Sequence, residues 1–270
     1  MQSDASKQHL VPLVSPNFGE RIGTLMHREM RTRFSGGALG YAWAFLTPVA
    51  WIGFVVVAFH LLNRLPPISV SPQLFVATGI LPYILFRQTI TSTMRALQAS
   101  RYMIYAPSIS VADILLAASL LELMNAVIIA VALFGAFLLL FDAQLPVDPL
   151  KVAFGLLLAW LLGAGFGRFS AILARMSDTY GRLVPTMLRP MFWISGIFFT
   201  ATELPESAVK IFYFSPLFHA IEIVREGFFL GYSSPLSDPI VPFVGGAFFF
   251  ATSLVIERYW KAIDKKRGVL

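Results

Sequence analysis

An uncharged stretch of 22 residues, Tyr41 to Leu62, constrains the fold of this chain more than any other feature. As an α-helix it would be about 33 Å long, which is enough to cross the hydrocarbon core of a membrane. A cationic segment, RTRFSGGALG, comes directly before it, and Tyr41 and Trp43 lie at its start. Basic residues followed by aromatic residues are typical of the cytosolic end of a transmembrane helix. The stretch therefore predicts a membrane protein.

The composition of the whole chain supports this prediction. Of its 270 residues, 57% are hydrophobic and 13% are charged, whereas soluble domains carry about 25% charged residues. The net charge of +6 raises nucleic acid as an alternative partner. We expect no nucleic acid, because membrane proteins concentrate Lys and Arg in their cytosolic segments. The chain contains no cysteine, so disulfides and thiolate metal sites are excluded.

Five further apolar segments have the character of membrane spans. They cover residues 74–94, 111–141, 150–167, 183–200 and 240–255. We therefore predict an all-α membrane protein with six transmembrane helices. The polar segment 168–182 is expected to return to the cytosol between the fourth and fifth spans. In the fourth span, Ala159, Gly163 and Gly167 recur every four residues, a spacing that lets a neighbouring helix approach closely.

An amphipathic helix is predicted before the first span. Asn17 and Glu20 have the spacing of a capping box, which begins a helix. Over residues 17–36, apolar side chains share one broad face, while most basic ones lie opposite, as in helices that lie in the membrane interface. The apolar residues are Phe18, Ile22, Leu25, Met26 and Met30.

Two short apolar pieces follow the fifth span, at residues 208–214 and 217–230. Each is too short to cross a membrane, and Ser215 followed by Pro216 is a typical start for a new helix. We therefore predict a pair of re-entrant helices that dip into the outer leaflet. The residues assigned to this pair are Ser215, Glu222, Arg225 and Glu226.

The positive residues predict the orientation of the chain. With both termini in the cytosol, six spans place 17 Lys and Arg residues in or near cytosolic segments and four outside. This bias favours cytosolic termini. The predicted organisation is a flexible N-terminus at 1–16, one transmembrane domain at 17–260 and a basic cytosolic tail at 261–270. Within that domain the interface helix covers 17–36 and the six spans cover 41–260.

Motifs for several enzymatic reactions are absent from the sequence. It has no G-x-x-x-x-G-K-[ST] loop, no H-E-x-x-H and no G-x-S-x-G. The four histidines are scattered, and none is spaced as a metal pair. We therefore predict a protein that is not an enzyme and has no catalytic, cofactor or metal site.

The candidates for contact with a transported molecule are a charge and a set of aromatic residues. Arg87, inside the second span, either snorkels to the interface or lines a cavity. Glu122 and Asn125 share a helix face in the third span, where they bond a neighbouring helix or relay protons. Aromatic residues near span ends anchor the chain or contact sugar rings. The aromatic candidates are Tyr41, Trp43, Phe45, Tyr83, Phe86, Trp193, Phe198 and Phe199.

Three segments carry a resemblance to a known family. HREMRTRFSGGALGYAWAFLTPV, at 27–49, resembles the start of type-two ABC exporter permeases, where a basic interface helix leads into the first span. LFVATGILPYILFR, at 74–87, and SPLFHAIEIVREGFF, at 215–229, are similar to the capsule polysaccharide export inner-membrane protein family. The resemblance covers about residues 18–260. Permeases for O-antigen and teichoic acid share the fold and much of this pattern, and they stay as alternatives.

The resemblance implies a homodimeric permease in the bacterial inner membrane. Two separate ATPase subunits would bind ATP and Mg²⁺, so no cofactor is expected in this chain. The substrate would be a lipid-linked capsular polysaccharide, exported from cytosol to periplasm between the first, second and fifth spans of two protomers. A periplasmic adaptor, an outer-membrane export protein and membrane lipids would be further partners. The re-entrant helices would be periplasmic, and the ATPase would dock on Arg101, Tyr102, Met103, Tyr105 and Pro107.

Two other classes of protein remain possible on sequence grounds. A lipid or drug exporter of the same fold would be expected to have a smoother apolar cavity, with few tyrosines and arginines. A membrane-anchored scaffold would not need a fifth span broken by Pro185 and Pro190.

Overall fold

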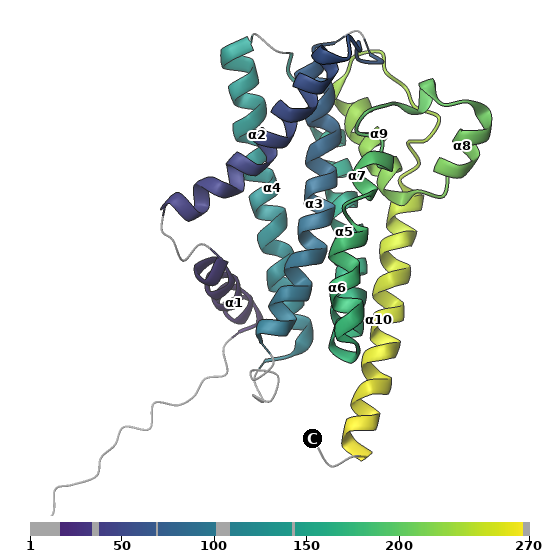
Figure 1. Cartoon of the computed structure of the whole chain (residues 1–270). Coiled ribbons are helices and arrows are strands. Elements are labelled where there is room, and N and C mark those ends of the chain that lie inside the picture. Colours follow the sequence, from purple (N-terminus) through teal and green to yellow (C-terminus); the bar gives the residue numbers. More distant parts are fainter. Residues whose placement is uncertain (1–16, 34–37, 69, 101–108, 142–143, 267–270) are drawn as a thin grey trace, which may run out of the picture.

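A computed structural model describes residues 17–33, 38–68, 70–100, 109–141 and 144–266 (Figure 1). The predicted flexible segment 1–16 and the predicted ATPase contacts at 101–107 lie outside these residues. All secondary-structure elements within the described ranges are helical. They are α1 (Phe18–Arg33), α2 (Ala38–Leu61), α3 (Pro72–Ala99), α4 (Val111–Phe141), α5 (Pro149–Met176), α6 (Asp178–Met187), α7 (Met191–Ile194), η2 (Ala201–Glu203), α8 (Glu206–Phe212), α9 (Pro216–Phe228) and α10 (Ile240–Lys266).

Four helices are long and apolar enough to cross a membrane: α3, α4, α5 and α10. They run side by side in Figure 1, while α2 slants away from α3. Helices α8 and α9 meet at 107° and count as a fifth crossing if they form one broken span. The all-α membrane fold is therefore confirmed, with four to five candidate spans among the described residues, and the six-span arrangement stays a prediction.

The fourth predicted span is longer than expected. Helix α5 continues past the predicted span end at Gly167 to Met176, so the first part of segment 168–182 is helical. The cytosolic position of this segment stays a prediction. The helix continues because the Arg168 guanidinium is buried, where it donates to Ser253 Oγ at 3.0 Å and pairs with Glu257 of α10. Ser177 then ends α5 and caps α6, its Oγ accepting from Tyr180 N at 3.3 Å.

The fifth predicted span is broken, as its prolines indicate. Residues 183–200 form the end of α6, the single turn of α7 and an extended segment that leads to η2. Tyr83 of α3 donates its hydroxyl to Leu188 O at 2.8 Å, and so satisfies a carbonyl that the break leaves outside the helical pattern. The break is therefore a defined structure held by α3.

Helix α5 occupies the centre of the bundle, where it packs against α3, α9 and α10. Gly163 and Gly167 face α3 at short range. A Cβ on Gly163 would lie 3.0 Å from Phe86 O, and one on Gly167 would lie 2.4 Å from Thr93 Oγ1. The predicted close approach of a neighbouring helix is therefore confirmed, and the neighbour is α3.

Helix α1 packs against the ends of α3 and α4 (Figure 1). Ile22 and Leu25 are buried against a small cluster that includes Ala117 of α4, while Phe18 is 58% exposed. Arg28 donates to Ser100 Oγ at 2.6 Å, directly after α3. A helix is therefore present at Phe18–Arg33, and part of its apolar face is covered by protein. Its placement in the membrane interface stays a prediction.

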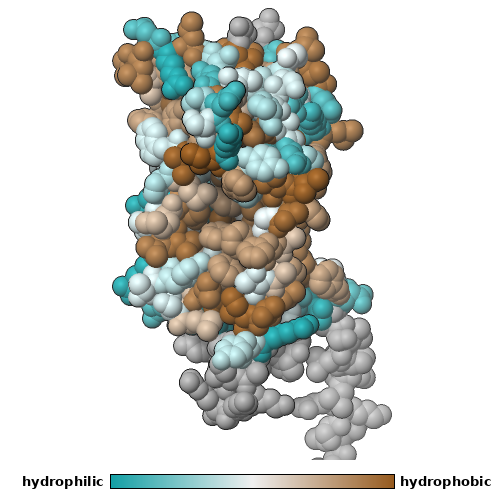
Figure 2. Space-filling model, turned by 90° about the vertical axis from the view of Figure 1, so that its right-hand side faces the viewer, coloured by the Kyte–Doolittle hydropathy of each residue, from teal (hydrophilic) through white to brown (hydrophobic). Residues whose placement is uncertain are grey.

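The surface is divided in the way that a membrane protein requires. In Figure 2, apolar side chains gather across the middle of the face that is shown, and hydrophilic ones lie mainly toward its two ends. Helices α4 and α10 contribute strongly to this exposed apolar surface, with examples at Val131, Leu139, Phe243 and Val255. Such a surface is stable in lipid and costly in water.

Candidate functional site

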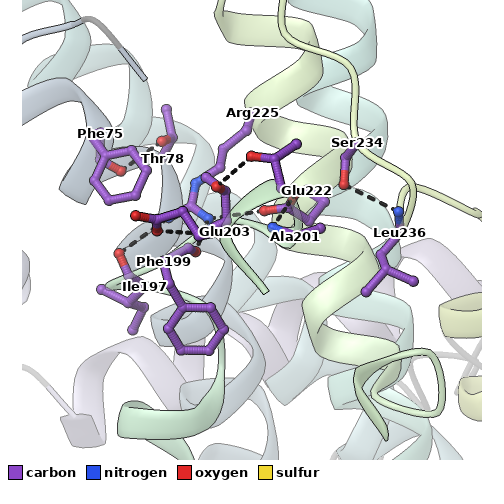
Figure 3. Close-up of polar contacts among 12 residues, drawn as sticks. Phe75, Thr78, Ile197, Phe199, Ala201, Glu203, Glu222, Arg225, Ser234 and Leu236 are labelled. Carbon is purple, nitrogen blue, oxygen red and sulfur yellow. Dashed lines mark hydrogen bonds and ion pairs between the residues drawn. The ribbon is translucent and has the colours of Figure 1, made fainter. Parts of the chain in front are cut away.

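A buried ion pair lies in the middle of α9. Arg225 is fully buried, and its Nη1 donates to Glu222 Oε1 at 3.0 Å (Figure 3). The same guanidinium donates to Phe199 O at 2.8 Å and to Ile197 O at 3.1 Å, and it lies 4.3 Å from the centre of the Phe75 ring of α3. A guanidinium out of water needs such partners, because its charge is costly to desolvate. Arg225 therefore joins α9, α3 and the segment after α7.

Glu222 completes this network from the other side. Its Oε2 accepts from Ala201 N at 3.3 Å and from the hydroxyl of Tyr232 in the loop after α9. Burial and the neighbouring carboxylate of Glu222 raise the pKa of the Tyr232 hydroxyl well above its ordinary value. The hydroxyl therefore keeps its proton at neutral pH and acts as the donor in this bond.

The segment held by this network depends on a glycine. Gly196 has φ +89°, a conformation that favours glycine, and a Cβ there would lie 2.4 Å from the ring of Phe218. Phe199 packs in the same region, with its ring 5.3 Å from Phe212 and 5.8 Å from Phe218. The chain after α7 is thus fitted closely onto α8 and α9.

Two further polar clusters hold the remaining sides of α9. Glu226 pairs with Lys151 of α5 at 2.8 Å and accepts from Ser234 N at 2.6 Å. His219 Nδ1 accepts from Asp238 N at 3.1 Å, and its Nε2 lies 2.9 Å from Tyr213 O. Because Nδ1 accepts, Nε2 carries the proton and donates to that carbonyl.

Helix α9 begins where the sequence predicts, and it is buried along most of its length. The predicted start at Ser215 and Pro216 is confirmed, with Pro216 in the first turn. Every residue from 217 to 225 is buried, including the charged Glu222 and Arg225. The charged side is covered because the segment after α7 and the loop at 229–239 fold over it. Whether the pair of helices is re-entrant stays a prediction.

A wide apolar groove brings together two of the predicted channel residues. Trp43 of α2 and Trp193 of α7 are 66% and 59% exposed, and both line a groove of about 600 Å³. Leu46, Ala50 and Phe54 form its floor along α2. Phe198, another predicted channel residue, stacks on Trp193 with ring centres 5.1 Å apart and planes 9° apart.

The other predicted aromatic residues lie elsewhere. Tyr83 and Phe86 are buried in the main core, and Tyr83 is engaged with Leu188. Phe199 belongs to the aromatic cluster around Phe218. Tyr41 and Phe45 are part of α2, but their side chains lie outside the described ones. Their contact with a transported molecule stays a prediction, as it does for Trp43 and Trp193.

Arg87 lines a separate, polar pocket of about 370 Å³ between α3 and α6. Its guanidinium lies 6.0 Å from the Tyr83 ring centre and makes no hydrogen bond or ion pair with a described residue. Helix α3 ends at Ala99, so Arg87 lies twelve residues, about 18 Å of helix rise, before that end. It is therefore farther from the helix end than the predicted span 74–94 suggested.

The sequence interpretation missed the buried pair between Arg168 and Glu257. Arg168 was assigned to a cytosolic connection and Glu257 to the polar end of the chain, yet both are buried. The available signal was the sequence from Pro149 to Met176, which contains no proline after its first residue. Within the described residues there is no group of three or more potential metal-ligating His, Cys, Asp or Glu side chains.

The sequence matches a known family along most of the chain. A family model described as "ABC-2 type transporter" matches residues 20–229, from α1 to the first residue after α9. The chain belongs to the ABC-2 type transporter family. The matched region contains the groove, the Arg87 pocket and the Arg225–Glu222 pair, while Tyr232 lies beyond its end.

Curated members of similar sequence cover nearly the same length. The chain is 27% identical over 242 residues to the capsule polysaccharide export inner-membrane protein BexB of Haemophilus influenzae. This alignment covers 88% of this chain and 87% of that protein. It is 26% identical over 218 residues to the polysialic acid transport protein KpsM of Escherichia coli, covering 79% and 83%. The protein CtrC of Neisseria meningitidis serogroup A, also named for capsule polysaccharide export, is 26% identical over 212 residues, covering 77% and 78%.

Proposed function

We propose that this chain is the permease subunit of an ATP-driven exporter that moves a lipid-linked capsular polysaccharide across the bacterial inner membrane. The observation that carries the proposal is the similarity along most of its length to three curated proteins, each named for capsule or polysialic acid transport. The absence of a phosphate-binding loop from the sequence supports a separate ATPase subunit.

The proposed assembly is a homodimer with two ATPase subunits. Six crossings would arise from α2, α3, α4, α5, the α6–α7 region and α10, with both termini cytosolic and α8 and α9 re-entrant on the periplasmic side. The ATPase would dock on residues 101–107, which directly follow Ser100 and the contact of Arg28 with that residue. A periplasmic adaptor and an outer-membrane protein would continue the export route.

The groove beside Trp43 and Trp193 would form part of the sugar path. Both rings are exposed in the single chain, although tryptophan is usually buried in part, so a partner or a substrate is expected to cover them. Aromatic faces contact the apolar faces of sugar rings, and a second protomer placed against α2 would enclose the groove.

The proposal is tested by deleting the gene in its bacterial host. Export should stop, and polysaccharide should accumulate inside the cell, where antibody or lectin staining detects it after permeabilisation. The wild-type gene supplied on a plasmid should restore staining of intact cells. Normal surface polysaccharide in the deletion strain would contradict the proposed function.

A further inference from the structure

The pocket between α3 and α6 is polar, basic and placed in a helix that crosses the membrane. It extends along one face of α3, where residues at positions 87, 88, 91, 94, 95 and 98 share a side of the helix. The residues that line it include Arg87, Gln88, Arg95, Gln98, Gly181 and Pro185. None of the eight lining residues is acidic.

Arg87 is the central charge of this pocket. It is half-buried, and its guanidinium makes no hydrogen bond or ion pair with a described residue. A cation inside a transmembrane helix is costly unless water or an anion compensates it. The other buried arginines have such compensation, since Arg168 pairs with Glu257 and Arg225 pairs with Glu222. Among the described residues, Arg168 and Arg225 each have an acidic counter-ion, and Arg87 has none.

The shape of the pocket favours an extended ligand. Arg95 follows Arg87 by two helical turns, about 12 Å of rise, and its Nε donates to Thr91 O at 3.2 Å, which directs the guanidinium along the helix. Gln98 lies one turn farther, next to Gly181 of α6: a Cβ on that glycine would be 3.5 Å from Gln98 Nε2. Glycine at this position leaves room for the Gln98 amide between the two helices.

The neighbouring pocket differs in charge. It is lined by Arg28, Thr32 and Arg95, but also by Glu29, whose carboxylate repels an anion. The anion site is therefore expected on the Arg87 side of Arg95. Guanidinium groups bind phosphate oxygens in pairs, and side-chain amides both donate to and accept from sugar hydroxyls.

We infer that the pocket between α3 and α6 binds a phosphate ester that carries a sugar, with Arg87 and Arg95 on the phosphate and Gln88 and Gln98 on the sugar. That this ligand is the head group of the exported glycolipid rests on the proposed function. A pocket of about 370 Å³ is within the range of small-molecule sites. If Arg87 only snorkelled to the membrane surface, it would need no specific ligand.

The test uses the full chain in neutral detergent and isothermal titration calorimetry. The probes are a hexose phosphate, the free hexose and a short-chain phosphatidylglycerol. The wild-type chain should bind the hexose phosphate and not the free hexose. Arg87→Gln and Arg95→Gln should each weaken binding about tenfold, the loss expected for one charge-assisted contact. Arg87→Lys should bind with intermediate affinity, because it keeps the charge and loses the planar fork.

The control is Arg258→Gln, which removes an exposed charge from α10 and should leave binding unchanged. Thermal unfolding should show that all variants remain folded. Equal binding of the hexose phosphate by wild type and Arg87→Gln would overturn the site. Arg87-dependent binding of phosphatidylglycerol without binding of the hexose phosphate would overturn the sugar-phosphate assignment and identify an ordinary phospholipid site.

Export in the deletion strain separates this inference from the proposed function. A chain that binds hexose phosphate through Arg87 but fails to restore surface polysaccharide would leave the site standing and contradict the function. A chain that restores export, and whose Arg87→Gln variant binds and exports normally, would overturn the site and leave the function standing.

Discussion

At the scale of single residues, the α9 network shows how a charge is kept inside this protein. The two Nη atoms of Arg225 donate to one carboxylate and two backbone carbonyls, and its guanidinium lies over an aromatic ring. A buried pair of this kind is a modest source of stability, but the loss of one partner leaves the other charge uncompensated. Replacing one member of the pair should therefore destabilise the protein more than replacing both.

Arg225→Met is expected to lower the free energy of unfolding by about 3–5 kcal/mol, because Glu222 then remains buried as an unpaired acid. The double variant Arg225→Met with Glu222→Leu should recover part of that loss. Thermal unfolding in detergent measures both, with the exposed Lys210→Met of α8 as the matched control. An equal loss in the single and double variants would contradict a cost from the unpaired Glu222.

Gly196→Ala should also destabilise the protein, by roughly 1–2 kcal/mol from the backbone alone. Its φ of +89° is unfavourable for alanine, and the added carbon would meet the ring of Phe218. The control is Gly19→Ala in α1, where a Cβ meets nothing within 4 Å. The prediction fails if the two variants unfold at the same temperature.

At the scale of helices, the sequence predicts the elements that depend on local signals. The bounds of α4 follow from its apolar run, and the start of α9 follows from Ser215 and Pro216. The end of α5 does not, because Arg168 is compensated by Glu257, a residue 89 positions away. Local hydropathy assigns such a charge to a loop, since it cannot include a partner on another helix.

The candidate site was predictable to a similar extent. Trp43 and Trp193 are 150 positions apart, and both were selected because aromatic residues gather near span ends and breaks; the fold then places them in one groove. Tyr83 was selected on the same grounds, yet its hydroxyl serves the broken helix at Leu188. Residue type alone does not separate these roles, because burial depends on the packing of α3 against the α6–α7 region.

Helix α1 offers a test at this scale, because the natural chain has no cysteine. A single cysteine at Ile22, which is 7% exposed and packed on α4, should react slowly with a maleimide in detergent. A cysteine at the exposed His27 should react quickly. Equal rates would show that α1 does not dock on the bundle.

At the scale of the whole molecule, the proposed orientation places the α4–α5 connection outside the cytosol. A cysteine at Gln144 should therefore react with a membrane-impermeant maleimide applied to the periplasmic side, such as in spheroplasts. A cysteine at Thr179, at the start of α6, should react only after the membrane is opened. The reverse pattern would invert the topology and contradict cytosolic termini.

The groove belongs to the same scale, since it would be enclosed by the second protomer. Trp43→Ala together with Trp193→Ala should reduce surface polysaccharide severalfold, with protein level and thermal stability nearly unchanged because both rings are exposed. Surface staining measures export, and Tyr259→Ala, an equally exposed aromatic residue of α10, serves as the control. Unchanged export in the double variant would remove the groove from the sugar path.

Helix α3 has a mechanical consequence for the assembly. It is one helix of 28 residues, about 42 Å long, with Phe75 beneath Arg225 near one end and Ser100, held by Arg28, just beyond the other. We therefore expect a displacement of α3 beside Ser100 to reach the α9 network through this one helix. Helix α3 contains Pro82, which lacks the N–H that would form a hydrogen bond to the preceding turn. We expect any bending of α3 to concentrate there, next to Tyr83 and little more than one turn from Arg87.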